Sequence, residues 1–277
     1  MPKSKFNRYS LKHNLLKKVT IRIDFDGLTN LDALIQRFKG HELSLLFGSY
    51  RRVIPSGVFT NNPSEYNNRQ DIVHELTEIS HVFYDYQPAA DNVEVTLTAS
   101  YVSIQIRCVD YANIDPYRNL MRALIKQILA SDTFIVITKI GIRKIGAYEN
   151  DDPKKLFSVF EHDMFSMRKL EELNSTLKVG YIQTSYEDSL CVVIKYPVCA
   201  RIKRLVRHMF DHKTDAHTLQ AILDIDASID EDTLRQHNVS GSYEEVIHAM
   251  DIINDVLFET FKASVTKKYL EKHGYVE

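Results

Sequence analysis

Three stretches of alternating apolar and polar residues follow one another in the first half of the chain, with very little sequence between them. They span residues 81–87, 93–98 and 101–109. A period of two is typical of half-buried β-strands. The breaks at 88–92 and 99–100 are too short for a crossover to a parallel neighbour, which takes about a dozen residues or more. The sequence therefore predicts an antiparallel meander.

Further strands and helices are predicted around this meander. A strand is expected at 19–25, followed by a helix over 31–38 that Thr29 or Asn30 can cap. Pro116 suits the first turn of a helix that runs to Leu129, and a β-branched strand follows at 133–145. Residues 43–59 look extended and 60–70 look like a loop. Other helices are predicted over 71–80, 156–173 and 242–272.

The second half repeats an order of elements found in the first. Strands at 179–185 and 190–196 would form a hairpin around a turn at 186–189, followed by a helix over 200–210 and a strand at 217–225. The order strand, strand, helix, strand also describes residues 93–147. We therefore predict an α+β protein with antiparallel sheets and segregated helices. The pattern suggests two similar halves, followed by a long C-terminal helix.

The turn around Asp151–Pro153 is the best candidate for a domain boundary. We expect residues 1–18 to be a flexible N-terminal segment. Residues 19–152 and 153–277 would then be two α+β subdomains, the second ending in the long helix. At 277 residues the chain is long enough for either two small domains or one large one.

Charge and cysteine content narrow the functional classes. The net charge of −2 gives no global field that would draw the chain onto nucleic acid, so such a site would have to be a local patch. The chain has three cysteines, Cys108, Cys191 and Cys199. An odd number without paired short spacing argues against a disulfide framework and suits a reducing cytoplasm. We expect Cys108 and Cys191 to be core residues. No apolar run is long enough to predict a membrane span.

Several segments together resemble a known family. They are the meander VEVTLTASYVSIQIRCVDY, the strand TKIGIRKIGAYEN, the strand LDIDA and the terminal FETFKASVTKKYLEKHG. These resemble a sporadically distributed family of bacterial and archaeal proteins of about this length without an assigned function. Its pattern of basic, apolar, Gly, apolar, Arg matches Lys139–Arg143, although Lys144 stands where an aromatic residue is common. The resemblance implies patchy spread by gene transfer, which suits phage defence or toxin–antitoxin cassettes.

Two groups of basic residues are candidates for binding a ligand or phosphate. Alternation along the strand at 133–145 places Lys139 and Arg143 on one face, with Gly141 leaving room between them. The predicted helix over 200–210 carries Arg201, Lys203, Arg204 and Arg207. An amphipathic helix with a solvated charged face would also explain this second group.

The histidines His208, His212 and His217 form a weak candidate metal site. His208 and His212 would share one face of a helix, as helical zinc ligands do. No Glu follows the first of them, so the metalloprotease motif is absent. The alternative is a polar helix end whose cations favour the helix dipole.

Asp24 and Asp26 follow an apolar strand, as the catalytic Asp-x-Asp of haloacid-dehalogenase-type phosphatases does. Leu28 stands where that motif has Thr or Val, and the reaction needs a parallel α/β body. The pair Glu187-Asp188 followed by Lys195 resembles a nuclease core, yet Val193 replaces its second carboxylate. Glycine-rich phosphate loops are also missing from the sequence.

These observations favour a binding protein over an enzyme. Our leading hypothesis is a non-enzymatic interaction protein with a protein partner, belonging to a phage-defence or toxin–antitoxin-like system. The alternatives are a nucleic-acid or nucleotide-binding effector, including a nuclease, and a metal-dependent phosphohydrolase that uses Asp24 and Asp26. The sequence names no cofactor and no oligomeric state.

Overall fold

Nine strands form one antiparallel sheet in the computed structural model. The structure describes residues 15–54, 79–89, 91–109, 111, 113–150, 153–161, 181–211, 216–239 and 242–273. Within these residues the strand order is β2-β3-β4-β5-β1-β6-β9-β8-β7. The strands are β1 (Leu16–Asp26), β2 (Phe47–Val53), β3 (Ser80–Tyr86), β4 (Asn92–Leu97), β5 (Tyr101–Arg107), β6 (Val136–Asn150), β7 (Tyr181–Val193), β8 (Pro197–Asp211) and β9 (Ala216–Ile229). The α+β class and the predicted meander, which is β3–β5, are confirmed.

The centre of the sheet is the antiparallel pair β1 and β6. In the register, Ile21 lies between Ile104 of β5 and Ile142 of β6, and all three side chains are fully buried. On one side the chain returns to β1 through β2–β5, and on the other it returns to β6 through β7–β9. The sheet and the hydrophobic core therefore both cross the proposed boundary near residue 152. The division into subdomains stays a prediction.

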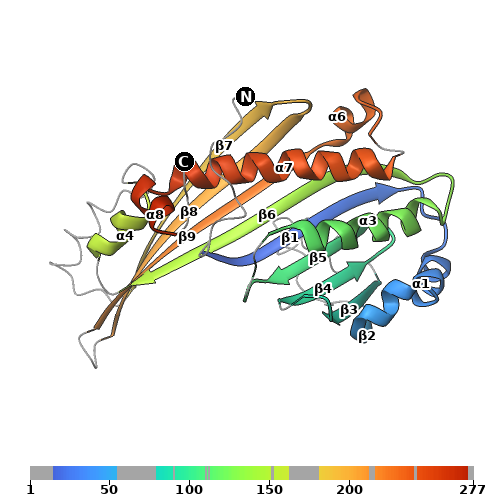
Figure 1. The fold of residues 1–277 in the computed structure, drawn as a ribbon, viewed down its shortest axis with the longest axis horizontal. Coiled ribbons are helices and arrows are strands. Elements are labelled where there is room, and N and C mark those ends of the chain that lie inside the picture. The colour runs from blue at the N-terminus through green and yellow to red at the C-terminus, as the bar shows by residue number, and fades with distance from the viewer. Residues whose placement is uncertain are drawn as a thin grey trace, which may run out of the picture.

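The described helices lie on one side of the sheet (Figure 1). Helix α1 (Leu31–Lys39) follows β1 and is capped by Asn30, whose side chain accepts a hydrogen bond from the Ala33 amide. Helices α3 (Asp115–Leu129) and α7 (Tyr243–Ser264) pack on the sheet and on each other. Short elements complete the fold: η2 (Glu42–Leu46), α4 (Pro153–Val159), α6 (Glu231–Gln236) and α8 (Lys267–Lys272).

The predicted helix over 200–210 is wrong, because these residues belong to β8. The strand pairs with β7 over 197–209 and with β9 over 199–211, so its backbone groups find partners without a helix. The turn predicted at 186–189 is also wrong, since β7 runs through it and the chain turns at 194–196. Ile202 and Val206 are four residues apart, a spacing that places them on one face of either a helix or a strand, so the apolar pattern did not distinguish the two. The order strand, strand, helix, strand therefore does not describe the second half.

The ends of several elements differ from the prediction. Strand β1 begins at Leu16, inside the segment expected to be flexible. The long terminal helix is interrupted at Val265, which forms a β-bridge with Phe160, and Thr266 then caps α8. The predicted loop at 60–70, most of the helix at 71–80 and residues 162–173 lie outside the described residues. None of the described helices is long and apolar enough to span a membrane.

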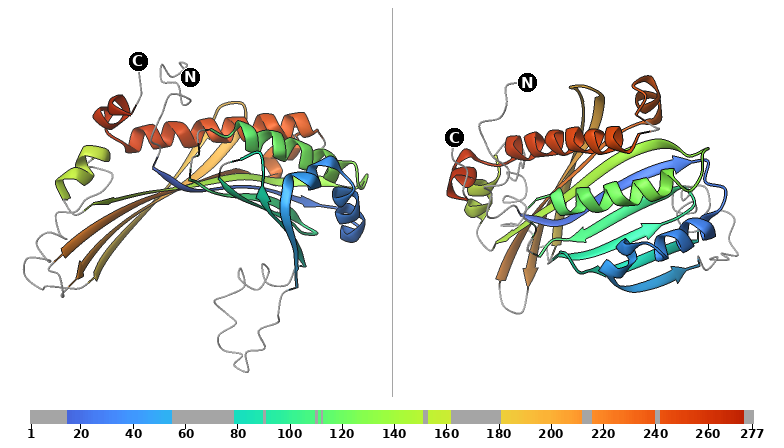
Figure 2. Two further views of the ribbon diagram at one scale, coloured as in Figure 1. Left: turned by 60° about the horizontal axis from the view of Figure 1, so that its bottom comes forward. Right: turned by 45° about the vertical axis from the view of Figure 1, so that its right-hand side comes forward.

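The other side of the sheet, which we call the uncovered face, carries none of the described helices. Figure 2 shows the sheet bent into an arch with α3 and α7 above it and the uncovered face on the inner, concave side. Side chains that alternate with buried core residues line this face, such as Thr20 and Arg22 beside Val19, Ile21 and Ile23. A concave, polar sheet face of this extent is the setting for the candidate site.

Candidate functional site

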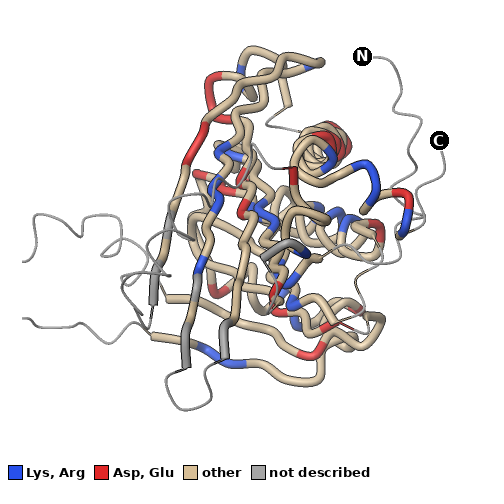
Figure 3. The backbone as a smooth tube through the Cα atoms, turned by 90° about the vertical axis from the view of Figure 1, so that its left-hand side faces the viewer, with Lys and Arg blue, Asp and Glu red and all other residues tan. Residues whose placement is uncertain are grey.

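Five of the six predicted ligand-binding cations lie on the uncovered face. Strand alternation directs Lys139 and Arg143 of β6 away from buried Ile140 and Ile142. The same argument applies on β8, where buried Ile202 and Val206 point toward the helices. The cations that share this face are therefore Lys139, Arg143, Arg201, Lys203 and Arg207. Figure 3 shows basic and acidic positions interleaved along these strands.

Carboxylates from β7 and β9 lie between these cations. The guanidinium of Arg143 donates two hydrogen bonds to Asp224, from Nε to Oδ1 at 2.8 Å and from Nη2 to Oδ2 at 2.5 Å. This contact is the main reason that the pKa of Arg143 is raised. Such two-pronged pairing fixes both side chains in one geometry.

Arg201 lies between two further carboxylates. Its Nε is 3.7 Å from Glu187 Oε1, and its Nη2 is 3.5 Å from Asp226 Oδ2. Lys203 lies directly between Glu187 and Asp224 in the strand register. Six residues line one hollow here, and we call them the charge cluster: Arg143, Glu187, Arg201, Lys203, Asp224 and Asp226.

Arg204 and Arg207 belong to different surroundings. Arg204 points to the helix side of β8 and forms an ion pair with Asp188, with only 11% of its side chain exposed. It is therefore separated from the other predicted cations by the thickness of the sheet. Arg207 shares the uncovered face but binds the amides of Gln183 and Gln220, at 3.1 and 3.3 Å.

The argument for a histidine metal site depended on a helix that does not form. His208 lies in β8 and His217 in β9, so spacing by four residues no longer places ligands on one face. His212 lies outside the described residues, and so do the side chains of the other two. Among the described residues, no three His, Cys, Asp or Glu side chains form a group that could hold a metal ion.

Asp24 and Asp26 lie at the end of β1 in an antiparallel setting. Asp24 accepts a hydrogen bond from Arg22 Nε at 2.6 Å on the uncovered face. Both neighbours of β1, β5 and β6, run antiparallel to it, unlike the parallel strands that carry the phosphatase motif. The phosphohydrolase hypothesis gains no support from this arrangement.

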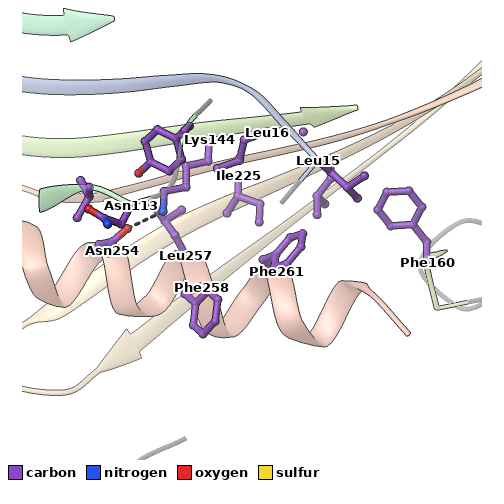
Figure 4. Close-up of a pocket in the computed structure, with 14 residues that line it drawn as sticks. Leu15, Leu16, Asn113, Lys144, Phe160, Ile225, Asn254, Leu257, Phe258 and Phe261 are labelled. Atoms are coloured by element: carbon purple, nitrogen blue, oxygen red, sulfur yellow. Dashed lines mark hydrogen bonds between the residues drawn. The ribbon is translucent and has the colours of Figure 1, made fainter. Parts of the chain in front are cut away.

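A hollow of about 70 Å³ lies between α7 and the sheet, and sequence analysis did not anticipate it. Figure 4 shows polar groups of Lys144, Asn113 and Asn254 at one end and Phe261 and Phe160 toward the other. Lys144 Nζ donates to Asn254 Oδ1 at 2.5 Å, and Asn254 is 3% exposed. The sequence signal for this hollow was Lys144, a cation on the otherwise apolar face of its strand.

This hollow has the chemistry of a small amphiphile site. One water molecule needs about 10–15 Å³ by this kind of measure, so the space suits only a few non-hydrogen atoms. The apolar lining would take a short hydrocarbon body, and the Lys144 ammonium would favour an acidic group at the polar end. Its nearest alternative is a hydrated gap that Lys144 and Asn254 share with solvent.

The expectation that Cys191 is a core residue is wrong. Cys191 and Cys199 are both exposed, whereas Cys108 is half-buried. Cys191 and Cys199 lie opposite each other on β7 and β8, with their sulfur atoms 3.0 Å apart. The spacing of eight residues gave no hint of this, because the hairpin turn was predicted elsewhere.

Comparison with protein-family models, with curated proteins and with solved structures finds no match to this chain. The family resemblance of the sequence therefore stays a prediction, and the function rests on the geometry of the uncovered face.

Proposed function

We propose that this chain is a non-enzymatic binding protein that holds a protein partner on the uncovered face of its sheet. The observation that carries the proposal is the charge cluster, in which Arg143, Arg201 and Lys203 alternate with three carboxylates across four strands. Side chains held in this way present a fixed pattern of positive and negative charges. Such a pattern gives specificity and register to a complementary protein surface.

The pairing favours a protein partner over a polyanion. Arg143 is already bound to Asp224 through both of its prongs, so a phosphate would have to displace a carboxylate. Glu149 of β6 also lies on this face, so the described residues of these strands carry five cations and four carboxylates there, an excess of only one positive charge. A surface that itself carries both signs would meet this pattern without an unpaired charge at the interface.

The biological setting that we propose comes from the family resemblance. It places the protein in the cytoplasm, as a component of a phage-defence or toxin–antitoxin-like system. Gene neighbours give a quick check of this part, because a metabolic operon around the gene would count against it.

Affinity purification from the native host, followed by mass spectrometry of protein and nucleic acid, tests the proposal. The wild-type chain is compared with a double variant, Arg143→Glu with Arg201→Glu, that reverses two charges of the cluster. The control, which reverses one charge away from the cluster, is Arg235→Glu on α6, whose side chain is 64% exposed and pairs with Glu231 one turn away. We expect one protein to be retained by wild type and control and lost from the double variant. Equal retention by all three would refute the use of this face.

Nucleic-acid binding is a second candidate, because five cations of β6 and β8 share a concave face. Contacts between all five and phosphates would give a log–log salt dependence with a slope of about −4. Filter binding of single-stranded RNA and of duplex DNA between low and moderate salt measures this slope. Absence of binding at low salt would remove this candidate and leave the protein partner untouched.

A further inference from the structure

A second chemical feature of the uncovered face is the pair of thiols at Cys191 and Cys199. Their sulfur atoms are 3.0 Å apart, and both residues are exposed. They share an open hollow with Lys139, Arg201 and Asp226, so the pair lies beside the charge cluster. Reagents in solution can therefore reach both sulfur atoms.

The positions of the two residues in the sheet suit a covalent bond between them. Cys191 of β7 and Cys199 of β8 are direct partners in the antiparallel register. Residues opposed in this way have Cα atoms about 4.5–5.5 Å apart, and disulfides span about 4.4–6.8 Å. Side-chain rotation alone can close the bond, and the backbone of the hairpin can stay as it is.

We propose that Cys191 and Cys199 are a redox modification site that forms a reversible cross-strand disulfide. With hydrogen peroxide as oxidant, one thiolate attacks a peroxide oxygen and the O–O bond breaks, which gives a sulfenic acid while the other oxygen leaves as hydroxide and is protonated to water. The second thiol then attacks that sulfur and expels a second water. Two thiols lose two electrons and two protons in all, which the peroxide takes up. A dithiol reductant reverses the reaction by exchange.

The surroundings of Cys199 and Cys108 disfavour the thiolate forms of these two residues at neutral pH. The pKa of the Cys199 thiol is raised to about 11, chiefly by its hydrogen bond with Cys191. The pKa of Cys108 is raised to about 12, chiefly by burial. Because the thiolate is the reactive form, oxidation should speed up as the pH rises above neutrality. Cys108 should stay reduced, since it is half-buried and follows β5, which β1, β6 and β9 separate from β8 in the sheet.

Oxidation would also act on the charge cluster next to the thiols. A bond between β7 and β8 restrains the edge of the sheet that carries Glu187 and Arg201. A restrained surface loses less conformational freedom when a partner binds, so the oxidised form should bind more tightly. This consequence rests on the proposed function, whereas the disulfide itself does not.

The purified full chain, treated with hydrogen peroxide or with a thiol reductant, tests the disulfide directly. Intact mass spectrometry should show a loss of about 2 Da that the reductant restores. Peptide mapping should place the cross-link between Cys191 and Cys199. The variant Cys108→Ser should behave like wild type, and Cys199→Ser and Cys191→Ser should each fail to lose this mass. Free alkylation of both thiols after peroxide treatment, or a cross-link that includes Cys108, would overturn the proposal.

Partner capture by the oxidised and reduced forms tests the consequence separately. We expect the oxidised chain to retain several-fold more partner than the reduced chain. Equal capture by two forms of verified redox state would refute the regulation and leave the disulfide in place. Failure of both forms to capture any partner would instead count against the proposed function.

Discussion

Arg143 and Lys144 are neighbours in the sequence, and strand β6 places them on opposite faces of the sheet. Arg143 faces the uncovered side, where 47% of its side chain is exposed and it pairs with Asp224. Lys144 faces α7, where it bonds to the side chain of buried Asn254. Of two neighbouring cations, one therefore has a carboxylate and water around it and the other a buried neutral amide.

This difference shows how strongly a one-residue step in a strand changes what a charge does. On the covered face a polar group must be satisfied by the protein itself, because the helices exclude most water. On the uncovered face, ion pairs contribute little to stability, and their positions are available for recognition. Stability and binding should therefore respond to substitutions on different faces.

The largest expected effect separates the two faces with adjacent residues. Ile142→Ala should lower the free energy of unfolding by about 2–5 kcal/mol, because it leaves a cavity at the centre of the sheet. Arg143→Ala should cost less, about 1–2 kcal/mol, since its side chain is 47% exposed although its partner Asp224 is only 14% exposed. Urea denaturation of both variants measures the difference. Similar losses for the two would contradict the assignment of the faces.

A smaller effect is expected at the polar contact of the covered face. Asn254→Ala removes the acceptor of the Lys144 ammonium from a buried site and should cost about 1–3 kcal/mol. Asp255→Ala, at an exposed position on the same helix, is the control and should change stability little. Equal unfolding midpoints for the two variants would show that Lys144 finds a better partner than Asn254.

Local patterns predicted the parts of the fold in which period and length agree. The meander β3–β5 and the helix from Asp115 to Leu129 were found because each has one clear spacing and short or proline-marked ends. The segment at 200–210 failed because its apolar residues fit two periods. Only pairing with β7 and β9 decides between the two periods, and the misplaced turn hid the pairing with β7.

The candidate site was predicted in part, for the same reason. Alternation alone placed Lys139 and Arg143 together, since β6 is a long and regular strand. The carboxylates beside Arg143, Asp224 and Asp226, come from β9, and no local pattern predicts which strands become neighbours. The thiol pair and the hollow beneath α7 were missed because each is formed by contacts between elements.

A pH-dependent effect is expected at His81, which is on the same face as Phe83 and is 3% exposed. Burial is the main reason that the pKa of His81 is lowered from its usual 6.5. Below about pH 6.5 the unfolded chain binds a proton that folded His81 takes up only at lower pH, so stability should fall as the pH falls. His81→Gln should flatten this part of the stability profile, measured by urea denaturation between neutral and acidic pH. An unchanged profile would mean that other groups dominate acid sensitivity.

The smallest effect on stability, and the sharpest separation of the two faces, is expected from Arg143→Lys. Lysine keeps the positive charge beside Asp224 but lacks the planar fork that makes two parallel hydrogen bonds. The free energy of unfolding should change by only about 0.5 kcal/mol, because the charge beside Asp224 is kept and the side chain at position 143 is 47% exposed. Partner retention should nevertheless fall several-fold, since a mobile ammonium no longer holds Asp224 in place for recognition. The opposite exchange at the neighbouring position, Lys144→Arg, should lower stability more than it lowers capture, because the larger guanidinium must fit beneath α7. If both variants lost stability and capture in the same proportion, the two faces would not be separate in function.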